Sequence, residues 1–444
     1  MRYQKAAYWF TNDLRLSNNT LLSQMANEVE QACFIYVIDE TEFAEPIFQN
    51  KGMGDSRKRF LLDSLQNLYS QLTKLGHRLL VFTGNPKAIV KQLAHNLALD
   101  AVYVGKQIGW HEAAQVDYLR AELPLVSFEQ VSQNQLFELS HLLDDSSLFS
   151  SFTRFRKYVE SSALEVNSEH NLQKVLPRNL LTTNRLDIKD VLDSLLTLRP
   201  KTEVKPYIRG GEAAAAFHLS EYFNTSSPSS YKETRNALDE WSSSTKFSPY
   251  LANGNISVKA VWQEVDNYEA LHGSNDSTYW IKFELLWREF FQWLAIKSGT
   301  RLFSFNGSRS QPPLTCYYPE RFQKWVTGNT PYLIVNACIK QLNTTGYISN
   351  RGRQLVASCF VNEFALDWRY GAAYFQQQLI DYDVAANWGN WQYIAGVGVD
   401  PRGGRHFNLA KQTAIYDADS SFINKWANKK TEPLDSLDIV DWPI

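Results

Sequence analysis

The first 130 residues alternate short apolar runs with amphipathic stretches, and this alternation restricts the possible folds more than any other feature of the sequence. The apolar runs that we predict to be strands are residues 6–10, 32–38, 79–82, 101–104 and 125–128. Between the second and third runs, residues 56–75 place leucines and a phenylalanine on one helical face and stop at Gly76. Strands that alternate with helices predict an α/β doubly wound parallel sheet.

Glycines do not follow the first strand in the pattern that dinucleotide sites use. The strand runs instead into residues 11–15, Thr-Asn-Asp-Leu-Arg. Gly52-Met-Gly54 lacks the third glycine of the pattern and falls in a predicted loop. We therefore predict that this domain is not a dinucleotide site, despite its topology.

Beyond Gly210 the strand signals vanish and helical periodicity takes over. The helical stretches are residues 213–222, 258–271, 280–296 and 355–364. Residues 140–210 have weak periodicity and many Ser, Asp and Asn residues, as a long connector would. At 444 residues the chain exceeds what one core usually organises. The predicted parts are an α/β domain over residues 1–133, a connector over 134–209 and an all-α domain over 210–444.

Composition excludes several classes of protein. The net charge of -2 gives no global attraction to nucleic acid, so any DNA binding would come from a local basic patch. The four cysteines form no Cys-x-x-Cys pair and no cluster with histidines at metal-ligand spacing, so we expect neither disulfides nor a metal site. The N-terminus is too charged for a signal peptide and no apolar run reaches membrane-spanning length. We expect a cytoplasmic protein that does not contact membranes.

Residues 381–391 form the most informative short run, Asp-Tyr-Asp-Val-Ala-Ala-Asn-Trp-Gly-Asn-Trp. The pattern is too irregular for one amphipathic helix, and such groups are costly to bury unless their hydrogen bonds are used. An isoalloxazine ring would use them. Asp383 could accept from its ring NH, and Asn387 could offer a carbonyl to a proton on its reducible nitrogen. On its own, the run is explained equally well as a polar turn between two helices.

The predicted helix over residues 280–296 carries charged and aromatic residues on one face. Those at spacings i, i+4, i+7, i+8 and i+11 are Trp280, Glu284, Trp287, Arg288 and Phe291. An aromatic stripe usually faces a core, but the two charged residues favour a polar ligand. Alternatively, Glu284 and Arg288 form an ordinary i,i+4 ion pair.

In order and spacing, these motifs resemble those of the photolyase/cryptochrome family from about residue 5 to residue 426. The motifs are residues 244–251, 279–291, 347–354, 366–371 and 381–391. Details in residues 152–157, 210–212, 231–236 and 350–354 are similar to the DASH branch in particular. The resemblance implies an α/β antenna domain, an all-α FAD-binding catalytic domain and a blue-light-driven activity.

The resemblance also implies a set of FAD-binding residues. They are Tyr231, Ser244, Thr245, Lys246, Phe247, Ser248, Arg288, Arg353, Asp381, Asp383 and Asn387. Residues 244–248 would cradle the phosphates where a helix opens at Pro249, although Ser and Thr before Pro can be merely a helix start. Arg353 is similar to the family's ion-pair partner of Asp381, and Arg288 would approach the diphosphate. The DASH branch usually carries a methenyltetrahydrofolate antenna, for which Glu112 is a candidate, unless it only begins a helix.

Two tryptophans resemble the inner members of the family's electron-transfer chain, which reduces the flavin in light. They are Trp391 and Trp368. Thr315 stands where the third tryptophan is expected. Tyr317 or Tyr318 could substitute, but a phenol must lose a proton when it is oxidised.

The resemblance implies repair of cyclobutane pyrimidine dimers in single-stranded DNA, from which a dimer leaves the stack at least cost. Glu284 would hydrogen-bond the dimer, and burial could keep it protonated so that it donates to a dimer carbonyl. The other candidate substrate contacts are Trp287, Asn350, Gln354 and Tyr393, with a basic rim of Arg351, Arg402 and Arg405. The rim could equally be a solvated loop.

Two alternatives to repair remain open at this point. A signalling photoreceptor without repair, acting on an unknown partner, would need the same flavin site. A light-independent flavoenzyme would leave Trp368 and Trp391 without a role. In every case we expect a monomer.

Overall fold

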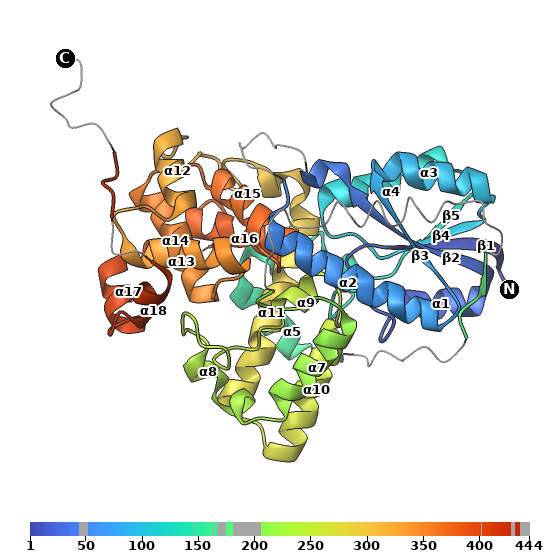
Figure 1. The fold of residues 1–444 in the computed structure, drawn as a ribbon, viewed down its shortest axis with the longest axis horizontal. Helices are drawn as coiled ribbons and strands as arrows, with labels where there is room; N and C mark the ends of the chain where they lie inside the picture. The colour runs from blue at the N-terminus through green and yellow to red at the C-terminus, as the bar shows by residue number, and fades with distance from the viewer. Residues whose placement is uncertain are drawn as a thin grey trace, which may run out of the picture.

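The computed structural model describes residues 1–43, 52–145, 147–162, 164–166, 175–180, 206–400, 402–427 and 431–435. Much of the predicted connector, residues 167–174 and 181–205, lies outside the described residues. A sheet domain and a helical domain lie side by side, as Figure 1 shows. This arrangement confirms the predicted α/β domain followed by an all-α domain. Whether the boundaries fall at residues 133 and 209 stays a prediction.

The sheet is parallel throughout, and its main path has the strand order β3-β2-β1-β4-β5. The bounds are β1 (Tyr3–Phe10), β2 (Val29–Asp39), β3 (Leu79–Gly84), β4 (Ala101–Val104) and β5 (Ser127–Glu129). Each contains or overlaps a predicted strand. A short strand from the predicted connector, β6 (Arg178–Asn179), pairs with β2. An order that runs outward in both directions from β1 is that of a doubly wound fold.

Helices cover both faces of the sheet, which explains why the central residues of β1, β2 and β4 are apolar on both faces. On one face, α1 (Thr20–Glu28) and α2 (Asp55–Lys74) pack their leucines against β1 and β2. On the other, α3 (Pro86–Leu97) and α4 (Trp110–Glu122) pack against alternate residues of the same strands.

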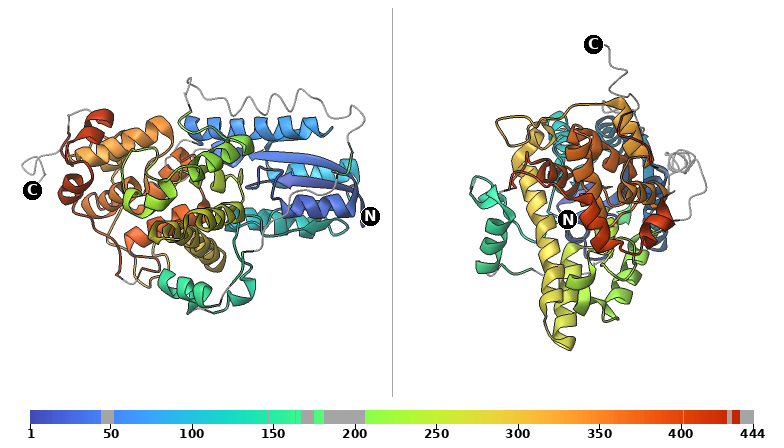
Figure 2. Two further views of the ribbon diagram at one scale, coloured as in Figure 1. Left: turned by 90° about the horizontal axis from the view of Figure 1, so that it is seen from below. Right: turned by 90° about the vertical axis from the view of Figure 1, so that its left-hand side faces the viewer.

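The longest described helix of the helical domain is α11 (Asp276–Ser298), which is visible along its length in Figure 2. The other helices of this domain are α7 (Glu212–Phe223), α8 (Tyr231–Thr234), α9 (Ser248–Ala252), α10 (Val258–His272), α12 (Pro319–Thr327), α13 (Leu333–Thr345), α14 (Asn350–Ser358), α15 (Trp368–Gln378), α16 (Val384–Ala395), α17 (Leu409–Tyr416) and α18 (Ser421–Trp426). The helix predicted over 355–364 begins earlier, and its second half, Cys359–Glu363, is a π-helical turn. From the connector, α5 (Phe152–Ser161) packs onto α11.

Residues 381–391 do not form one amphipathic helix, as predicted, although most of the run is helical. Residues from Val384 onward form α16, which is buried on several sides, so it needs no polar face. Glycines permit this close packing: a Cβ on Gly389 would overlap the ring of Phe291, and one on Gly371 would overlap Trp391. Asp383 ends the turn that precedes α16 and caps the helix through the backbone NH of Ala386 at 2.9 Å.

The loop after β1 joins the two domains. The buried guanidinium of Arg15 donates to the carbonyl of Gln133 at 3.0 Å and to that of Gly254, in the helical domain, at 3.1 Å. The carboxylate of Glu212 accepts from the backbone NH groups of Leu16 and Ser17, both at 2.8 Å. The domains are therefore held by hydrogen bonds to charged groups, which are the stronger kind.

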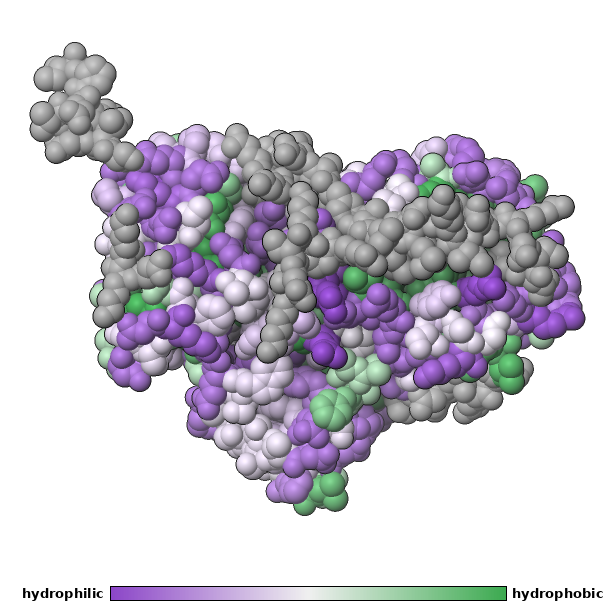
Figure 3. Space-filling model, in the orientation of Figure 1, coloured by the Kyte–Doolittle hydropathy of each residue, from purple (hydrophilic) through white to green (hydrophobic). Residues whose placement is uncertain are grey.

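On the face seen in Figure 3, hydrophilic residues predominate and apolar residues form small separate patches. Among the described residues, no helix has both the length and the apolar character needed to cross a membrane.

Gly254→Ala should weaken this junction. Gly254 has φ +66°, and an added Cβ would overlap the carbonyl of Asn12. We expect a loss of about 3 kcal/mol or more in the free energy of unfolding, since left-handed strain and overpacking add. In the control Gly76→Ala, φ is +79° but the space is open, so the expected loss is only about 1–2 kcal/mol. Urea denaturation of both variants checks the difference, and equal losses would contradict the role of the junction.

Candidate functional site

Two adjoining cavities in the helical domain bring together the residues predicted to bind FAD. Their empty volumes are about 820 and 1050 Å³. Both are lined by Ser248, Tyr347, Asn350, Arg353, Asp381, Asp383 and Ala386. Every predicted FAD-binding residue lines one cavity or the other. Gln354 and Trp391 also line the first, and Glu284 the second.

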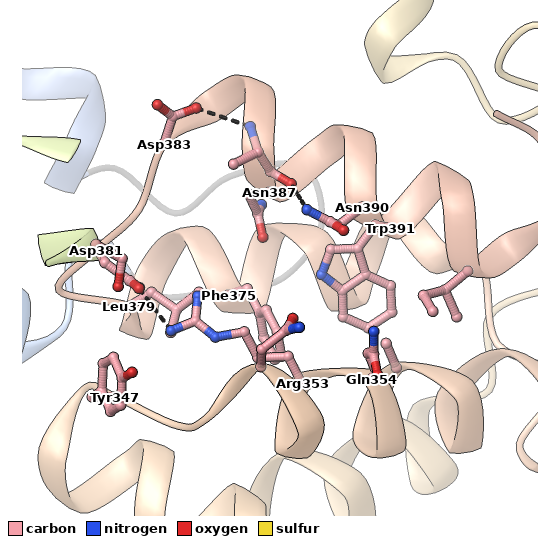
Figure 4. Close-up of a pocket in the computed structure, with 15 residues that line it drawn as sticks. Tyr347, Arg353, Gln354, Phe375, Leu379, Asp381, Asp383, Asn387, Asn390 and Trp391 are labelled. Atoms are coloured by element: carbon pink, nitrogen blue, oxygen red, sulfur yellow. Dashed lines mark hydrogen bonds and ion pairs between the residues drawn. The ribbon is translucent and has the colours of Figure 1, made fainter. Parts of the chain in front are cut away.

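The predicted ion pair between Arg353 and Asp381 is present at the wall of both cavities. Arg353, on α14, donates to Asp381 Oδ2 at 2.7 Å and to the carbonyl of Ile348 at 3.0 Å. The Asp381 side chain is 1% exposed, so its charge depends on this partner. Figure 4 shows the pair between α14 and the turn that leads into α16.

Unsatisfied polar atoms line the first cavity. Asp381 Oδ1, Asn387 Oδ1 and Trp391 Nε1 are buried without a hydrogen-bond partner among the described residues. The Asn387 amide donates to the carbonyl of Ala372 at 2.9 Å, which fixes its oxygen as the free group. In Figure 4 the Asn387 and Trp391 side chains extend from α16 toward α14. Buried polar groups are nearly always paired, so these atoms indicate a polar ligand.

An isoalloxazine ring fits this donor set, because it offers NH groups to carboxylate and amide oxygens and accepts from an NH. Asp383 has a second role that the sequence interpretation did not include. Asp383 Oδ1 is engaged in capping α16, whereas the buried oxygen without a partner belongs to Asp381. A capping role at Asp383 was hidden because the helix itself was not predicted.

Cations face the second cavity, where residues 244–248 form one wall. Lys246 is held in a left-handed conformation with φ +52° and donates to Ser244 Oγ at 2.7 Å. Burial lowers the pKa of Lys246 to about 8. Arg235 and Arg288 line the same cavity. These cationic side chains would bind an anionic diphosphate better than the N-terminus of the adjacent helix α9, because α9 is only five residues long.

The alternative ion pair between Glu284 and Arg288 does not form. Each of the two residues instead pairs with a residue from another segment of the chain. Glu284 pairs with Arg235, which directly follows α8, and Arg288 lies 3.8 Å from Asp383. Burial raises the pKa of Glu284 above its ordinary value, and the charge of Arg235 opposes the shift. Arg235 was missed as a site residue, although it stands four residues after Tyr231 and so faces the same side of one helical turn.

An aromatic cluster lies beside Glu284 on the same helix. Trp287 stacks on Phe152 of α5, with centroids 3.7 Å apart and planes at 12°. Tyr393 meets Trp287 edge-on at 5.8 Å. Trp287 is half-buried, so part of its surface is open. Phe152 was not predicted as a site residue, because its motif was noted only as a family detail and nothing in the sequence pairs it with α11.

The three arginines of the predicted basic rim do not line the two cavities. Arg351 donates to Asn236 at 3.1 Å and lies over the ring of Tyr416, and burial lowers its pKa. Arg405 pairs with the buried Asp400 at 3.1 Å and lies over the ring of Tyr393. Arg402 is exposed, and its backbone NH donates to Asp400. Two of the three charges are therefore already engaged.

Both candidate electron carriers are buried. Trp391 lines the first cavity and is 2% exposed, whereas Trp368, on α15, is fully buried and donates through its indole to the carbonyl of Phe305 at 2.9 Å. A free radical on either indole would be shielded from water.

Glu112 lies outside both cavities. It is half-buried in the first turn of α4, next to the place where this helix meets the helical domain. There the ring of His111 lies 5.4 Å from that of Phe303, and Trp110 packs near Gly299. Glu112 is thus placed near the contact between the two domains.

Comparison with known proteins agrees with this geometry. The family model for DNA photolyase matches residues 6–175, and that for the FAD binding domain of DNA photolyase matches residues 280–436. The chain is 45% identical to the cryptochrome DASH of Idiomarina loihiensis, over 100% of this chain and 97% of that protein.

Solved structures agree as well. A Synechocystis cryptochrome superposes with a TM-score of 0.88 at 34% identity and covers 95% of this chain and 88% of its own. An archaeal photolyase from Sulfolobus tokodaii, described with two FAD molecules, gives a TM-score of 0.76 at 27% identity over 96% of this chain and 90% of its own. The chain therefore belongs to the cryptochrome DASH family, and its helical part is a photolyase-type FAD-binding domain.

Proposed function

We propose that this protein is a light-driven photolyase that repairs cyclobutane pyrimidine dimers and prefers single-stranded DNA. The observation that carries the proposal is the placement of Glu284. Its carboxyl group lines the same cavity as the predicted cofactor residues, has a raised pKa and lies on the same helix as the half-buried Trp287. A protonatable group beside an aromatic surface suits a flipped base pair.

Bound FAD would supply the light absorption and the electron. The chain's own residues would then do three things. Arg353, Asp381 and Asn387 would orient the ring through their hydrogen bonds. The Glu284 carboxyl would hold a proton toward a carbonyl of the dimer, and the open surface of Trp287 would stack on its bases. Walls from α11, α14 and α16 would limit the access of water to the reacting groups.

We also propose a methenyltetrahydrofolate antenna near Glu112. Its position near the contact between the domains, outside both cavities, supports this. We infer that the protein acts as a monomer in the cytoplasm, where its four cysteines would stay reduced.

Arg353→Ala should reduce FAD retention, because it leaves the buried Asp381 charge without a partner. Breaking such a pair costs on the order of 3 kcal/mol, or a weakening of FAD binding by about two orders of magnitude. The double variant Arg353→Ala/Asp381→Asn should recover part of the loss, since no charge is then stranded. Equilibrium dialysis of FAD checks both. A folded wild-type protein that takes up no FAD would overturn the proposal.

Trp391→Phe should leave FAD bound but strongly slow its reduction in blue light, because phenylalanine is not oxidised at the required potential. Trp368→Phe should slow it nearly as much. Trp262→Phe, which changes a tryptophan on α10 that lines neither cavity, is the matched control. Flavin absorbance during illumination measures the rates. Unchanged rates in both variants would exclude this pair as the route.

Repair should be efficient on single-stranded dimers and poor on duplex, because flipping a paired dimer costs a few kcal/mol that the engaged rim arginines do not supply. Trp287→Ala should weaken substrate binding by about 1–3 kcal/mol through the lost stacking surface. Repair per photon at saturating substrate, measured on both strand forms, is the decisive comparison. Equal repair on duplex would indicate a conventional photolyase, and no repair on either would favour a signalling photoreceptor.

The pH dependence of repair should report Glu284. Its folded pKa is raised, so the carboxyl keeps its proton to higher pH than an ordinary glutamate and loses it as pH rises through the raised value. Repair per photon should therefore fall over that range. Glu284→Gln retains a donor and should remove this dependence, whereas Glu284→Ala should lower repair at every pH. A wild-type profile that is flat would contradict proton donation by Glu284.

A further inference from the structure

Aromatic side chains continue beyond Trp368 toward the surface of the molecule. The ring of Trp368 meets that of Trp388 edge-on, with centroids 5.8 Å apart. Trp388, on α16, is 5% exposed and donates through its indole NH to the hydroxyl of Tyr382 at 3.3 Å. Tyr382 lies in the turn before α16 and is half-buried. These contacts form a path from the fully buried indole of Trp368 to the partly exposed phenol of Tyr382.

We propose that Tyr382 is the terminal electron donor in light-driven flavin reduction and that Trp388 connects it to Trp368. The inference rests on the proposed photochemistry and deepens it. Thr315, at the position where a third tryptophan was expected, has no oxidisable group. Trp391 and Trp368 therefore need another residue as the terminal electron donor. Tyr382 is such a residue, because its phenol can be oxidised and is partly exposed.

Electrons and protons balance along this path. Bound FAD, excited by light, would supply the oxidant. Trp391 would give up one electron, and the hole would pass from Trp391 to Trp368 and then to Trp388. Trp388 is restored by one electron from Tyr382. The O–H bond of Tyr382 breaks, its proton passes to water, and a neutral phenoxyl radical remains.

Two contacts favour loss of the proton from Tyr382. Its oxygen accepts from the Trp388 indole, so its own proton points away from Trp388. The guanidinium of Arg57 lies over the ring at 4.8 Å from its centroid. A neighbouring cation disfavours a positively charged radical, so the electron and the proton should leave together. Once the proton is in water, return of the electron is slow.

A second aromatic branch leads from Trp391 but ends inside the protein. Trp325 meets Trp391 at 6.3 Å and is fully buried. The next ring, Tyr374, is 5.5 Å from Trp325, and its buried hydroxyl faces the Asn343 amide and the Val326 carbonyl. Neither group is a base that could take the proton, and burial raises the pKa of Tyr374. A hole on this branch would return to Trp391.

Tyr382→Phe is the sharpest test, because it removes only a hydroxyl from a half-buried side chain. Protein carrying ring-deuterated tyrosine is illuminated without added reductant, and the trapped radical is examined by electron paramagnetic resonance. In the wild type we expect a tyrosyl spectrum that narrows on deuteration. The signal should be lost in Tyr382→Phe and in Trp388→Phe, while flavin content stays unchanged. Tyr332→Phe, another half-buried tyrosine, is the control and should keep the signal.

The outcomes separate this inference from the proposed function. If wild-type flavin is not reduced by light, the photochemistry fails and the inference fails with it. If wild-type flavin is reduced and Tyr382→Phe keeps the same tyrosyl signal, only the inference is overturned. Loss of the signal in Tyr317→Phe would identify Tyr317 as the terminal electron donor and would also overturn the inference about Tyr382. The unfolding midpoint of each variant shows whether the chain is still folded.

Discussion

The buried guanidinium of Arg15 is the constraint on which the site depends. A charge without partners is very costly to bury, so the carbonyls of Gln133 and Gly254 must stay close to it. Beside it, Asn253 accepts from the backbone NH of Leu14 and donates to the carbonyl of Ile380, one residue before Asp381, both at 3.2 Å. The α/β domain therefore helps to fix the turn that carries the candidate flavin-facing carboxylates, even though it contributes no wall to either cavity.

Charged residues on α11 show how tertiary partners override local ones. An i,i+4 pair is worth only about 0.2–0.5 kcal/mol on an exposed helix, far less than the penalty for an unpaired buried charge. Glu284 and Arg288 therefore pair with Arg235 and Asp383 from other segments. Glu289, which is fully buried, accepts from two backbone NH groups at the start of the connector and from the indole of Trp293. One helix thereby joins the connector, the turn before α16 and the segment after α8.

Periodicity predicted the layers well, because strand and helix patterns report which faces of each element are buried. The ion pair of Arg353 with Asp381 was also foreseen, through the family resemblance. Other features depend on neighbours that sequence spacing does not reveal. The stack of Phe152 on Trp287 joins residues 135 positions apart, and the partner of Glu284 comes from 49 positions away. The partner of Arg405 was missed for the same reason: Arg405 has an exposed-loop sequence, but it pairs with the buried Asp400.

The irregular pattern of residues 384–391 is what a central helix with several different neighbours requires. Asn387 and Trp391 are four residues apart and so face the same cavity. Trp388 is one position on from Asn387, about 100° around the helix, and contacts Trp368 and Tyr382 instead. Glycine at position 389 lets α11 approach a third side. A helix with one polar face could not pack against the cavity, the rings of Trp368 and Tyr382, and α11 at the same time, so α16 has no such face. Its sequence instead places the residues that line the cavity on a different side from those that contact Trp368 and Tyr382.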